Sequence, residues 1–320
     1  MVAKLKNNNM NKQLFFFKCT IVSVLLSAFV FVSCQKEKIE QTTATTLKRP
    51  GASMTLATGN TSTFKVLSYN IYEGFRADSA RIAKFRLWVD TLQPAAIAFQ
   101  EMKGFTKASL QTFAESMGFN YTLMHHENGL PVALISKFPI TDIKSKPSTL
   151  HLIQAKILDY HFFVIHLNPN TYEKRKEEIG IILNRAKLIP KTEKVLMMGD
   201  FNNMSPQDSS FYDNNETKMN LVRASEINNP GTKVLNNGKI DYSTIQSMID
   251  EDYHDSWKLF RTNYDKSAPT KLRSHGNFTR IDYIWMNGTL VSSYANSYLV
   301  KDAFTDYASD HYPMVLILNR

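Results

Sequence analysis

The stretch Met198-Gly199-Asp200-Phe201-Asn202 follows a short hydrophobic run and places a carboxylate and an amide on either side of one phenylalanine. In an extended segment successive side chains alternate in direction, so Asp200 and Asn202 can project to one side while Phe201 anchors the other. A carboxylate can take a proton from water, and a neighbouring amide can orient that water or a phosphate oxygen. Taken alone, the stretch fits an ordinary turn after a strand equally well.

The same pattern, a hydrophobic strand next to a polar functional group, recurs along the chain. It is found at Asn70, Glu101, His166, Asp200 and Asp282. Strand ends on a rigid sheet can hold converging catalytic groups accurately. The recurrence therefore predicts one shared site at the edge of a sheet.

Hydrophobic periodicity places these strand ends in a chain of alternating strands and helices. Strands are predicted at Phe64–Asn70, Ala95–Gln100, Tyr121–Met124, Val132–Ser136, Leu150–Leu158, His161–His166, Lys194–Met198, Arg280–Met286, Leu290–Tyr298 and Tyr312–Leu318. Helices are predicted at Ala77–Leu92, Phe105–Met117 and Tyr172–Ile189, and polar loops with short helical turns at Asn202–Gly238. This mixture indicates an α/β or α+β domain over residues 64–320, and composition alone leaves its topology open.

The first 33 residues have the features of an export signal. Basic residues precede an apolar run, Ile21–Val32, which is shorter than the ~20 residues that a membrane-spanning helix needs. Phe31-Val32-Ser33-Cys34 resembles the lipobox of bacterial lipoproteins, in which the cysteine is lipidated and becomes the first mature residue. We expect Cys34 to anchor the protein to the cell envelope, at the outer membrane on its periplasmic or surface side; an ordinary signal peptide is the alternative.

Residues 34–63 are rich in Thr, Ser, Ala, Lys and Gly and are predicted to form a flexible tether. Removing the four lysines of the signal peptide lowers the formal net charge from +9 to +5. A moderately basic surface suits a polyanionic substrate or an anionic membrane, although it is also common on proteins that bind neither.

Two carboxylates near the C-terminus could pair with a histidine. Asp310 directly precedes His311, and Asp282 begins the run Asp282-Tyr283-Ile284. A carboxylate that is hydrogen-bonded to an imidazole fixes its tautomer and raises its proton affinity, as catalytic histidines require. Each of these motifs could also be a structural polar group.

Taken together and in order, these motifs resemble the endonuclease/exonuclease/phosphatase superfamily. The resemblance covers roughly Phe64 to Asn319 and rests on Ser68-Tyr69-Asn70-Ile71, Phe99-Gln100-Glu101, Ile165-His166-Leu167, Gly199-Asp200-Phe201-Asn202, Arg280-Ile281-Asp282-Tyr283 and Ser309-Asp310-His311. It implies a four-layer sandwich of two mixed β-sheets flanked by helices, as in deoxyribonuclease I.

The resemblance also implies a divalent metal, Mg²⁺ or alternatively Mn²⁺. Glu101 would be its main ligand, assisted by Asn70, and Asp310 would be a nearby ligand of the metal or of its water. Hard oxygen donors of this kind are what magnesium requires.

Residue by residue, the resemblance assigns the reaction to five further side chains. Asp200 and Asn202 would position or activate the attacking water. Asp282 and His311 would form the carboxylate–histidine pair at the phosphate, and His166 would stabilise the pentacovalent transition state. The implied chemistry is in-line attack of water on phosphorus without a covalent enzyme intermediate.

His166 indicates a subgroup of the superfamily, because enzymes that repair abasic sites usually have tyrosine at the corresponding position. The histidine is more similar to deoxyribonuclease I-type enzymes, bacterial sphingomyelinases and inositol phosphatases, in which a glutamate can partner it; Glu127 is a loose candidate. Arg280, within a basic cluster, and Asn128 are predicted to contact substrate phosphate, with a solvated loop as the alternative.

We therefore expect an exported, metal-dependent phosphodiesterase or nuclease, acting as a monomer. Its substrate is expected to be nucleic acid, a phospholipid head group or a small phosphate ester. One alternative is a sphingomyelinase-like or inositol-phosphate phosphatase activity. An alternative of another class is an inactive surface module that binds a polyanion or a partner.

Overall fold

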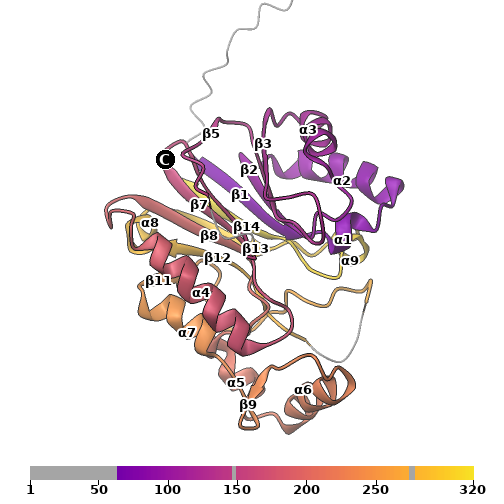
Figure 1. Cartoon of the computed structure of the whole chain (residues 1–320), viewed down its shortest axis with the longest axis vertical. Coiled ribbons are helices and arrows are strands. Elements are labelled where there is room, and N and C mark those ends of the chain that lie inside the picture. The colour runs from indigo at the N-terminus through magenta and orange to yellow at the C-terminus, as the bar shows by residue number, and fades with distance from the viewer. Residues whose placement is uncertain (1–62, 146–148, 274–277) are drawn as a thin grey trace, which may run out of the picture. The chain divides into compact units, whose positions relative to one another are not determined.

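The computed structural model describes residues 63–145, 149–273 and 278–320. Within these residues, two six-stranded mixed sheets pack face to face, and helices cover their outer faces (Figure 1). The predicted signal peptide, Cys34 and the tether up to residue 62 lie outside the described residues.

The first sheet contains the strand that opens the domain. Its order is β13-β14-β1-β2-β4-β3, in which β1 and β2 run parallel and the other neighbours are antiparallel. Its strands are β1 (Thr63–Asn70), β2 (Ala96–Gln100), β3 (Tyr121–Met124), β4 (Ala133–Ser136), β13 (Tyr294–Leu299) and β14 (Met314–Asn319).

The second sheet contains the stretch that ends in Asp200. Its order is β11-β12-β8-β7-β6-β5, with β7 and β8 parallel. Its strands are β5 (Ile140–Thr141), β6 (His151–Ile157), β7 (Tyr160–His166), β8 (Lys194–Asp200), β11 (Tyr253–Asp255) and β12 (Asp282–Asn287).

The two-residue alternation of the strands decides which side chains lie between the sheets. On β8, Leu196 and Met198 enter the core between the sheets, whereas Met197 packs under the helices on the outer face. Asp200 continues the inward series of Leu196 and Met198. On β1, Val66 faces inward and Asn70 follows four residues later on the same face. The functional side chains therefore lie on the inner faces of the two sheets, at one end of the hydrophobic core.

Helices close the outer faces through hydrophobic stripes. On the first sheet, α2 (Ser79–Leu92) and α3 (Lys107–Glu115) pack over one apolar cluster. On the second sheet, α4 (Tyr172–Ala186) and α7 (Ser243–Asp250) pack over another. Figure 1 places these two pairs of helices on opposite sides of the sheets. The predicted four-layer α/β sandwich is confirmed.

Two predicted segments differ in the structure. The predicted strand Leu290–Tyr298 begins instead as the short helix α8 (Gly288–Val291), because Leu290 turns into the core between the sheets, and β13 starts only at Tyr294. The predicted loop region Asn202–Gly238 contains the 13-residue helix α6 (Glu216–Asn228). This helix buries little apolar surface, so its periodicity is weak in the sequence.

Short elements complete the described chain. They are α1 (Tyr72–Phe75), the 3-10 turn Pro206–Asp208, α5 (Ser209–Tyr212), the hairpin of β9 (Leu235–Asn236) and β10 (Lys239–Ile240), and α9 (Thr305–Ala308). Among the described helices, none combines the length and the apolar character that crossing a bilayer would require.

Candidate active site

Asp200 lies where the strand ends meet. The parallel register of β7 and β8 pairs His166 with Asp200, and the antiparallel register of β8 and β12 pairs Asp282 with Asp200. On the facing sheet, Asn70 ends β1 beside the end of β2, after which Glu101 follows. The topology therefore brings the predicted residues of both sheets to one edge.

The Asp200 carboxylate is buried and surrounded by polar groups from both sheets. Its Oδ2 accepts a hydrogen bond from Asn70 Nδ2 (3.0 Å), and its Oδ1 accepts one from the backbone N–H of Asn202 (2.8 Å). The Nε2 atoms of His166 and His311 lie 3.7 and 3.8 Å from Oδ2. Burial raises the pKa of the Asp200 carboxyl, and the His311 imidazole opposes this rise. A carboxylate whose pKa is raised is better matched to accept a proton from water.

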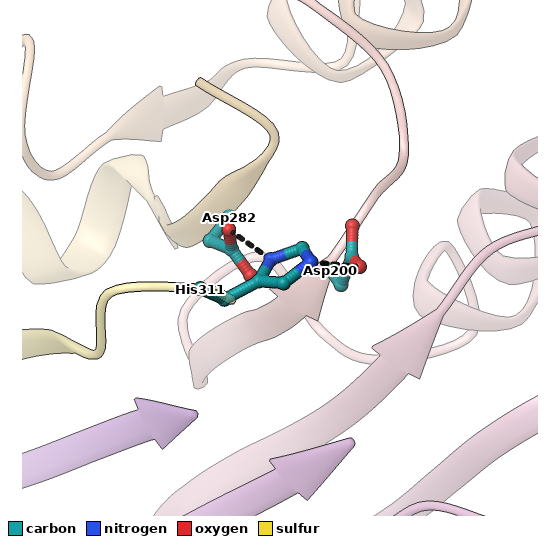
Figure 2. A group of neighbouring side chains, drawn as sticks. All are labelled: Asp200, Asp282 and His311. Atoms are coloured by element: carbon teal, nitrogen blue, oxygen red, sulfur yellow. Dashed lines mark hydrogen bonds and ion pairs between the residues drawn. The ribbon is translucent and has the colours of Figure 1, made fainter. Parts of the chain in front are cut away.

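His311 and Asp282 form the predicted carboxylate–histidine pair, shown in Figure 2. His311 Nδ1 donates to Asp282 Oδ2 at 2.8 Å. Burial alone lowers the pKa of His311, but the Asp282 and Asp200 carboxylates outweigh it and hold that pKa well above its usual value. The ring is therefore held as an imidazolium whose Nε2–H points to the Asp200 side. Such a group can donate to an anionic phosphate oxygen.

Glu101 and Asn70 are joined directly. Asn70 Nδ2 donates to Glu101 Oε1 (3.1 Å) as well as to Asp200, while Asn70 Oδ1 accepts from Tyr72 N (3.1 Å). Glu101 Oε2 accepts from Glu73 N (2.9 Å). The amide nitrogen of Asn70, rather than its oxygen, thus faces the carboxylates, and Asn70 orients Glu101 and Asp200 relative to each other. A role as a metal ligand would use the remaining lone pair of Oδ1.

Backbone strain accompanies two of the predicted residues. Glu101 has φ of +60° and Asn202 has φ of +49°, in the left-handed region that residues other than glycine rarely adopt. Such conformations persist where the surrounding structure enforces them, and they concentrate at functional sites. Asn202 is held further by a hydrogen bond from its Nδ2 to the Leu167 carbonyl (2.9 Å). Both side chains are therefore fixed in direction.

The acidic groups fit a divalent cation. Burial raises the pKa of Asp310, and the neighbouring Glu101 carboxylate raises it further. Like charges that converge in a partly buried site are stabilised by a cation between them. Asp200, Asp282 and His311 also offer ligand atoms that all lie within 4.8 Å of one another, but His311 as an imidazolium bonded to Asp282 has no lone pair for a cation. Glu101, Asp310 and Asn70 offer hard oxygen donors, which suit a divalent cation such as Mg²⁺ or Mn²⁺.

His166 stands at the end of a row of histidines. Its ring is 5.9 Å from that of His151, which lies 5.3 Å from His126 and 5.9 Å from His125 (ring centroids). The predicted partner Glu127 is exposed and accepts instead from the backbone N–H of a residue in α3. The environment of His166 is therefore set by imidazoles and by the site's carboxylates rather than by Glu127.

Arg280 does not have the predicted surface position. Its guanidinium is 1% exposed and is paired with Asp208 and Asp255 at 2.7 and 2.5 Å. Arg280 is separated from the exposed part of the basic cluster, because it directly precedes a buried strand and pairs with two buried carboxylates. A buried guanidinium with two carboxylate partners has a structural role, and the predicted contact with substrate phosphate does not fit this position. Asn128 is exposed on the loop between β3 and β4 and stays a candidate for substrate contact.

Two serines that were not among the predicted site residues support the centre. Ser309 Oγ donates to the Asn70 carbonyl (2.6 Å) and accepts from His311 N (3.2 Å), which ties the end of β1 to the segment that carries His311. Ser267 Oγ accepts from the backbone N–H of Asp282 (3.1 Å). Ser267 carried no signal in the sequence, because serine is common in loops, whereas Ser309 belongs to the Ser309-Asp310-His311 motif.

Comparison with known proteins agrees with the fold described above. Residues 67–311 match the model of the endonuclease/exonuclease/phosphatase family. No curated protein matches the chain. Among solved structures, an AP endonuclease from Archaeoglobus fulgidus is similar with a TM-score of 0.62 and 16% identity, over 80% of this chain and 100% of that one.

Two further structures share the fold at low identity. A 3' phosphatase from Neisseria, bound to product DNA hairpin, has a TM-score of 0.60 and 15% identity, over 80% of this chain and 100% of its own. An endonuclease/exonuclease/phosphatase from Beutenbergia cavernae has a TM-score of 0.55 and 14% identity, over 81% of this chain and 72% of its own. The family match extends from before Asn70 to His311, and the chain therefore belongs to the endonuclease/exonuclease/phosphatase family.

Proposed function

We propose that this protein is a divalent-metal-dependent phosphodiesterase that cleaves P–O bonds, with nucleic acid as its favoured substrate. The observation that carries the proposal is the arrangement around Asp200, a buried carboxylate between two imidazoles with Asn70 and the Asn202 N–H fixing its oxygens. This arrangement supplies a base for water and donors for the phosphate in the same few ångströms.

In the proposed reaction, Asp200 accepts the proton of the attacking water. The side-chain amide of Asn202 orients that water. His311, held charged by Asp282, donates from Nε2 to a phosphate oxygen as charge develops there. His166 approaches the same region from β7. Glu101, Asp310 and Asn70 would hold the metal, which supplies electrostatic stabilisation of the phosphate oxygens and of the leaving group.

Two alternatives differ from this proposal in distinct ways. A sphingomyelinase-like or inositol-phosphate phosphatase would use the same centre on another substrate. An inactive binding module would need a centre with a missing group, whereas Asn70, Glu101, Asp200, Asp282 and His311 are assembled here. The assembled centre favours an enzyme.

A substrate panel tests the proposal. Purified protein with Mg²⁺ would be assayed in parallel against single- and double-stranded DNA, RNA, sphingomyelin, inositol phosphates and bis(4-nitrophenyl) phosphate. We expect hydrolysis of the aryl diester and faster hydrolysis of a nucleic acid. Turnover of sphingomyelin or inositol phosphates alone would favour the sphingomyelinase-like or inositol-phosphate phosphatase function instead. No turnover of any substrate would reject an enzymatic role.

We also propose that Cys34 is lipidated and anchors the enzyme at the cell envelope, on the strength of the Val32-Ser33-Cys34 pattern after an apolar run. The Cys34→Ala variant is expected to leave the membrane fraction, because the variant lacks the sulfur that carries the diacylglycerol. Fractionation of cells that produce wild type and variant, with immunoblotting, measures this. Equal membrane association of the two proteins would contradict the anchor.

A further inference from the structure

Three histidines from the two sheets gather next to His166. His125 and His126 directly follow β3 of the first sheet, and His151 opens β6 of the second sheet, where the antiparallel register pairs it with His166. The ring centroids of His125 and His126 are 4.0 Å apart, and the centroid of His151 lies 5.3 Å from that of His126 and 5.9 Å from that of His125. The proposed reaction uses His166 and none of the other three.

His125 has one satisfied and one unsatisfied ring nitrogen. Its Nε2 lies 2.5 Å from the Leu150 carbonyl oxygen, and because a carbonyl oxygen only accepts, Nε2 carries the proton. In the neutral ring Nδ1 then keeps its lone pair, yet this atom is buried and has no hydrogen-bond partner among the residues that the structure describes. Histidines that bind metals commonly have this arrangement, with one nitrogen on the ion and the other N–H on a backbone carbonyl.

His126 has a second buried nitrogen of this kind. Its Nδ1 also lacks a hydrogen-bond partner within the described part of the chain. A buried polar atom without a partner costs free energy, and in a native structure it calls for an explanation, such as a bound ion. Two adjoining rings with the same unsatisfied atom indicate one shared ligand that accepts lone pairs from both.

The spacing of the three rings suits tetrahedral coordination by imidazole. A Zn²⁺ ion binds imidazole nitrogen at roughly 2.0–2.1 Å, which places the ring centroids of two ligands about 5 Å apart. The observed separations of 4.0, 5.3 and 5.9 Å lie around this value. The nitrogens themselves do not all lie within 4.8 Å of one another, since among the described residues only Asp200, Asp282 and His311 form such a group. Rotation about the side-chain bonds would turn the three rings onto one ion.

The cluster is accessible to an ion and lacks the ligands that Mg²⁺ requires. His125 and His126 line a pocket of about 390 Å³, and none of its described lining residues has a carboxylate. Lys144, which also lines the pocket, is paired with Asp142, so its charge is balanced. Glu127 accepts from a backbone N–H of α3 and is not part of the pocket lining. A site of imidazoles without carboxylates suits Zn²⁺, Cu²⁺ or Ni²⁺.

We propose that His125, His126 and His151 bind a divalent transition-metal ion of this class, at a site distinct from the Mg²⁺ or Mn²⁺ centre proposed at Glu101. Mg²⁺ needs hard oxygen ligands, so the two sites differ in the ion that they select. Three protein ligands leave a fourth coordination position free for water. The site does not depend on the proposed phosphodiesterase function, because none of its ligands takes part in that reaction.

Isothermal titration calorimetry with Zn²⁺ tests the site. The protein would carry no polyhistidine tag, and Mg²⁺ would be present at a concentration that saturates the proposed active centre. We expect Zn²⁺ to bind the wild type under these conditions. The variants His126→Gln and His151→Gln should each bind it at least tenfold more weakly, because each removes one of three ligands. The rise in melting temperature that Zn²⁺ causes in the wild type should shrink in both variants.

His254→Gln is the matched control, because His254 is also partly exposed and lies on β11, at the edge of the second sheet far from β6. It should change the zinc affinity by less than about twofold. Thermal unfolding without zinc shows whether each variant keeps the wild-type fold. X-ray absorption at the zinc edge of the wild type needs no variant, and it should show imidazole nitrogens at roughly 2.0–2.1 Å as the main ligands.

Three results would overturn the inference. The first is equal zinc affinity of the wild type and a folded His126→Gln variant, which would place the ion elsewhere, for example at Asp200 and Asp282. The second is an absorption spectrum with mainly oxygen ligands. The third is no zinc binding at all, which would leave the buried nitrogens to water. The substrate panel tests the phosphodiesterase activity separately, so failure of either proposal leaves the other standing.

Discussion

Asp200→Asn is expected to lower kcat for bis(4-nitrophenyl) phosphate by about 10³- to 10⁴-fold. General base catalysis contributes on this order, and asparagine keeps the size of the side chain while removing its ability to accept a proton. Asn70 Nδ2 and Asn202 N donate to the two carboxylate oxygens, and an amide at position 200 can accept only one of these bonds without rearrangement. Steady-state kinetics at saturating Mg²⁺ measures the effect.

His311→Ala is the companion variant for this prediction. It removes the donor to the phosphate and leaves Asp282 without its partner, so a loss of similar size is expected. Lys84→Ala, an exposed change on α2, is the control and should stay within about twofold of the wild type. A rate for Asp200→Asn within tenfold of the wild type would contradict the assignment of the base, provided that the variant has the melting temperature of the wild type.

Gly199→Ala is expected to destabilise the domain by roughly 4 kcal/mol or more, a large fraction of the roughly 5–15 kcal/mol that stabilises a typical domain. Gly199 has φ of +147°, and a Cβ atom there would lie 1.8 Å from the Ile165 carbonyl oxygen. Ile165 is its partner in the parallel pairing of β7 and β8, so the clash is with backbone at the centre of a sheet. Neither strand can withdraw without breaking the register that brings His166 to Asp200.

Gly180→Ala provides a matched control for the glycine prediction. Gly180 lies within α4, where a Cβ atom meets nothing within 4 Å. Alanine is the better helix former, so this variant should gain roughly 0.5–1 kcal/mol. Urea unfolding of the two variants and the wild type measures both effects. If Gly199→Ala were as stable as the wild type, the chain would accommodate the added Cβ atom. This result would contradict the close approach of β7 and β8 at Gly199.

The sequence pattern was sufficient for most strands and for the strand ends, whereas the four layers were implied by the family resemblance. Inward residues such as Leu196 and Met198 alternate with outward ones, and this period-two pattern determines the face on which Asp200 lies. Phe201 is fully buried as predicted, and Trp285 is a core residue. In β8 every residue from Val195 to Met198 is apolar, so the sequence predicted a buried strand, whereas the division of these residues between its two faces is seen only in the structure.

Features that depend on distant partners were not predictable. Arg280 lies 72 residues from Asp208 and 25 from Asp255, and nothing local in the sequence shows that these three groups meet in the interior. Tyr72 to Ala77 have φ between +46° and +67°, and Glu101, which lies 28 residues beyond Glu73, helps to hold this left-handed segment by accepting the Glu73 N–H. Helix α6 was missed for another reason: it buries only Met219 and Val222, which is too little for a clear stripe.

The most direct test of the central claim is the metal dependence of diester hydrolysis by the wild-type protein. The rate on bis(4-nitrophenyl) phosphate would be measured after exhaustive chelation and again after titration with Mg²⁺ or Mn²⁺. The proposed role of Glu101 and Asp310 predicts loss of turnover in chelator and full recovery with the added ion. An undiminished rate in chelator, with the metal content confirmed to be zero, would contradict the proposed metal-dependent mechanism.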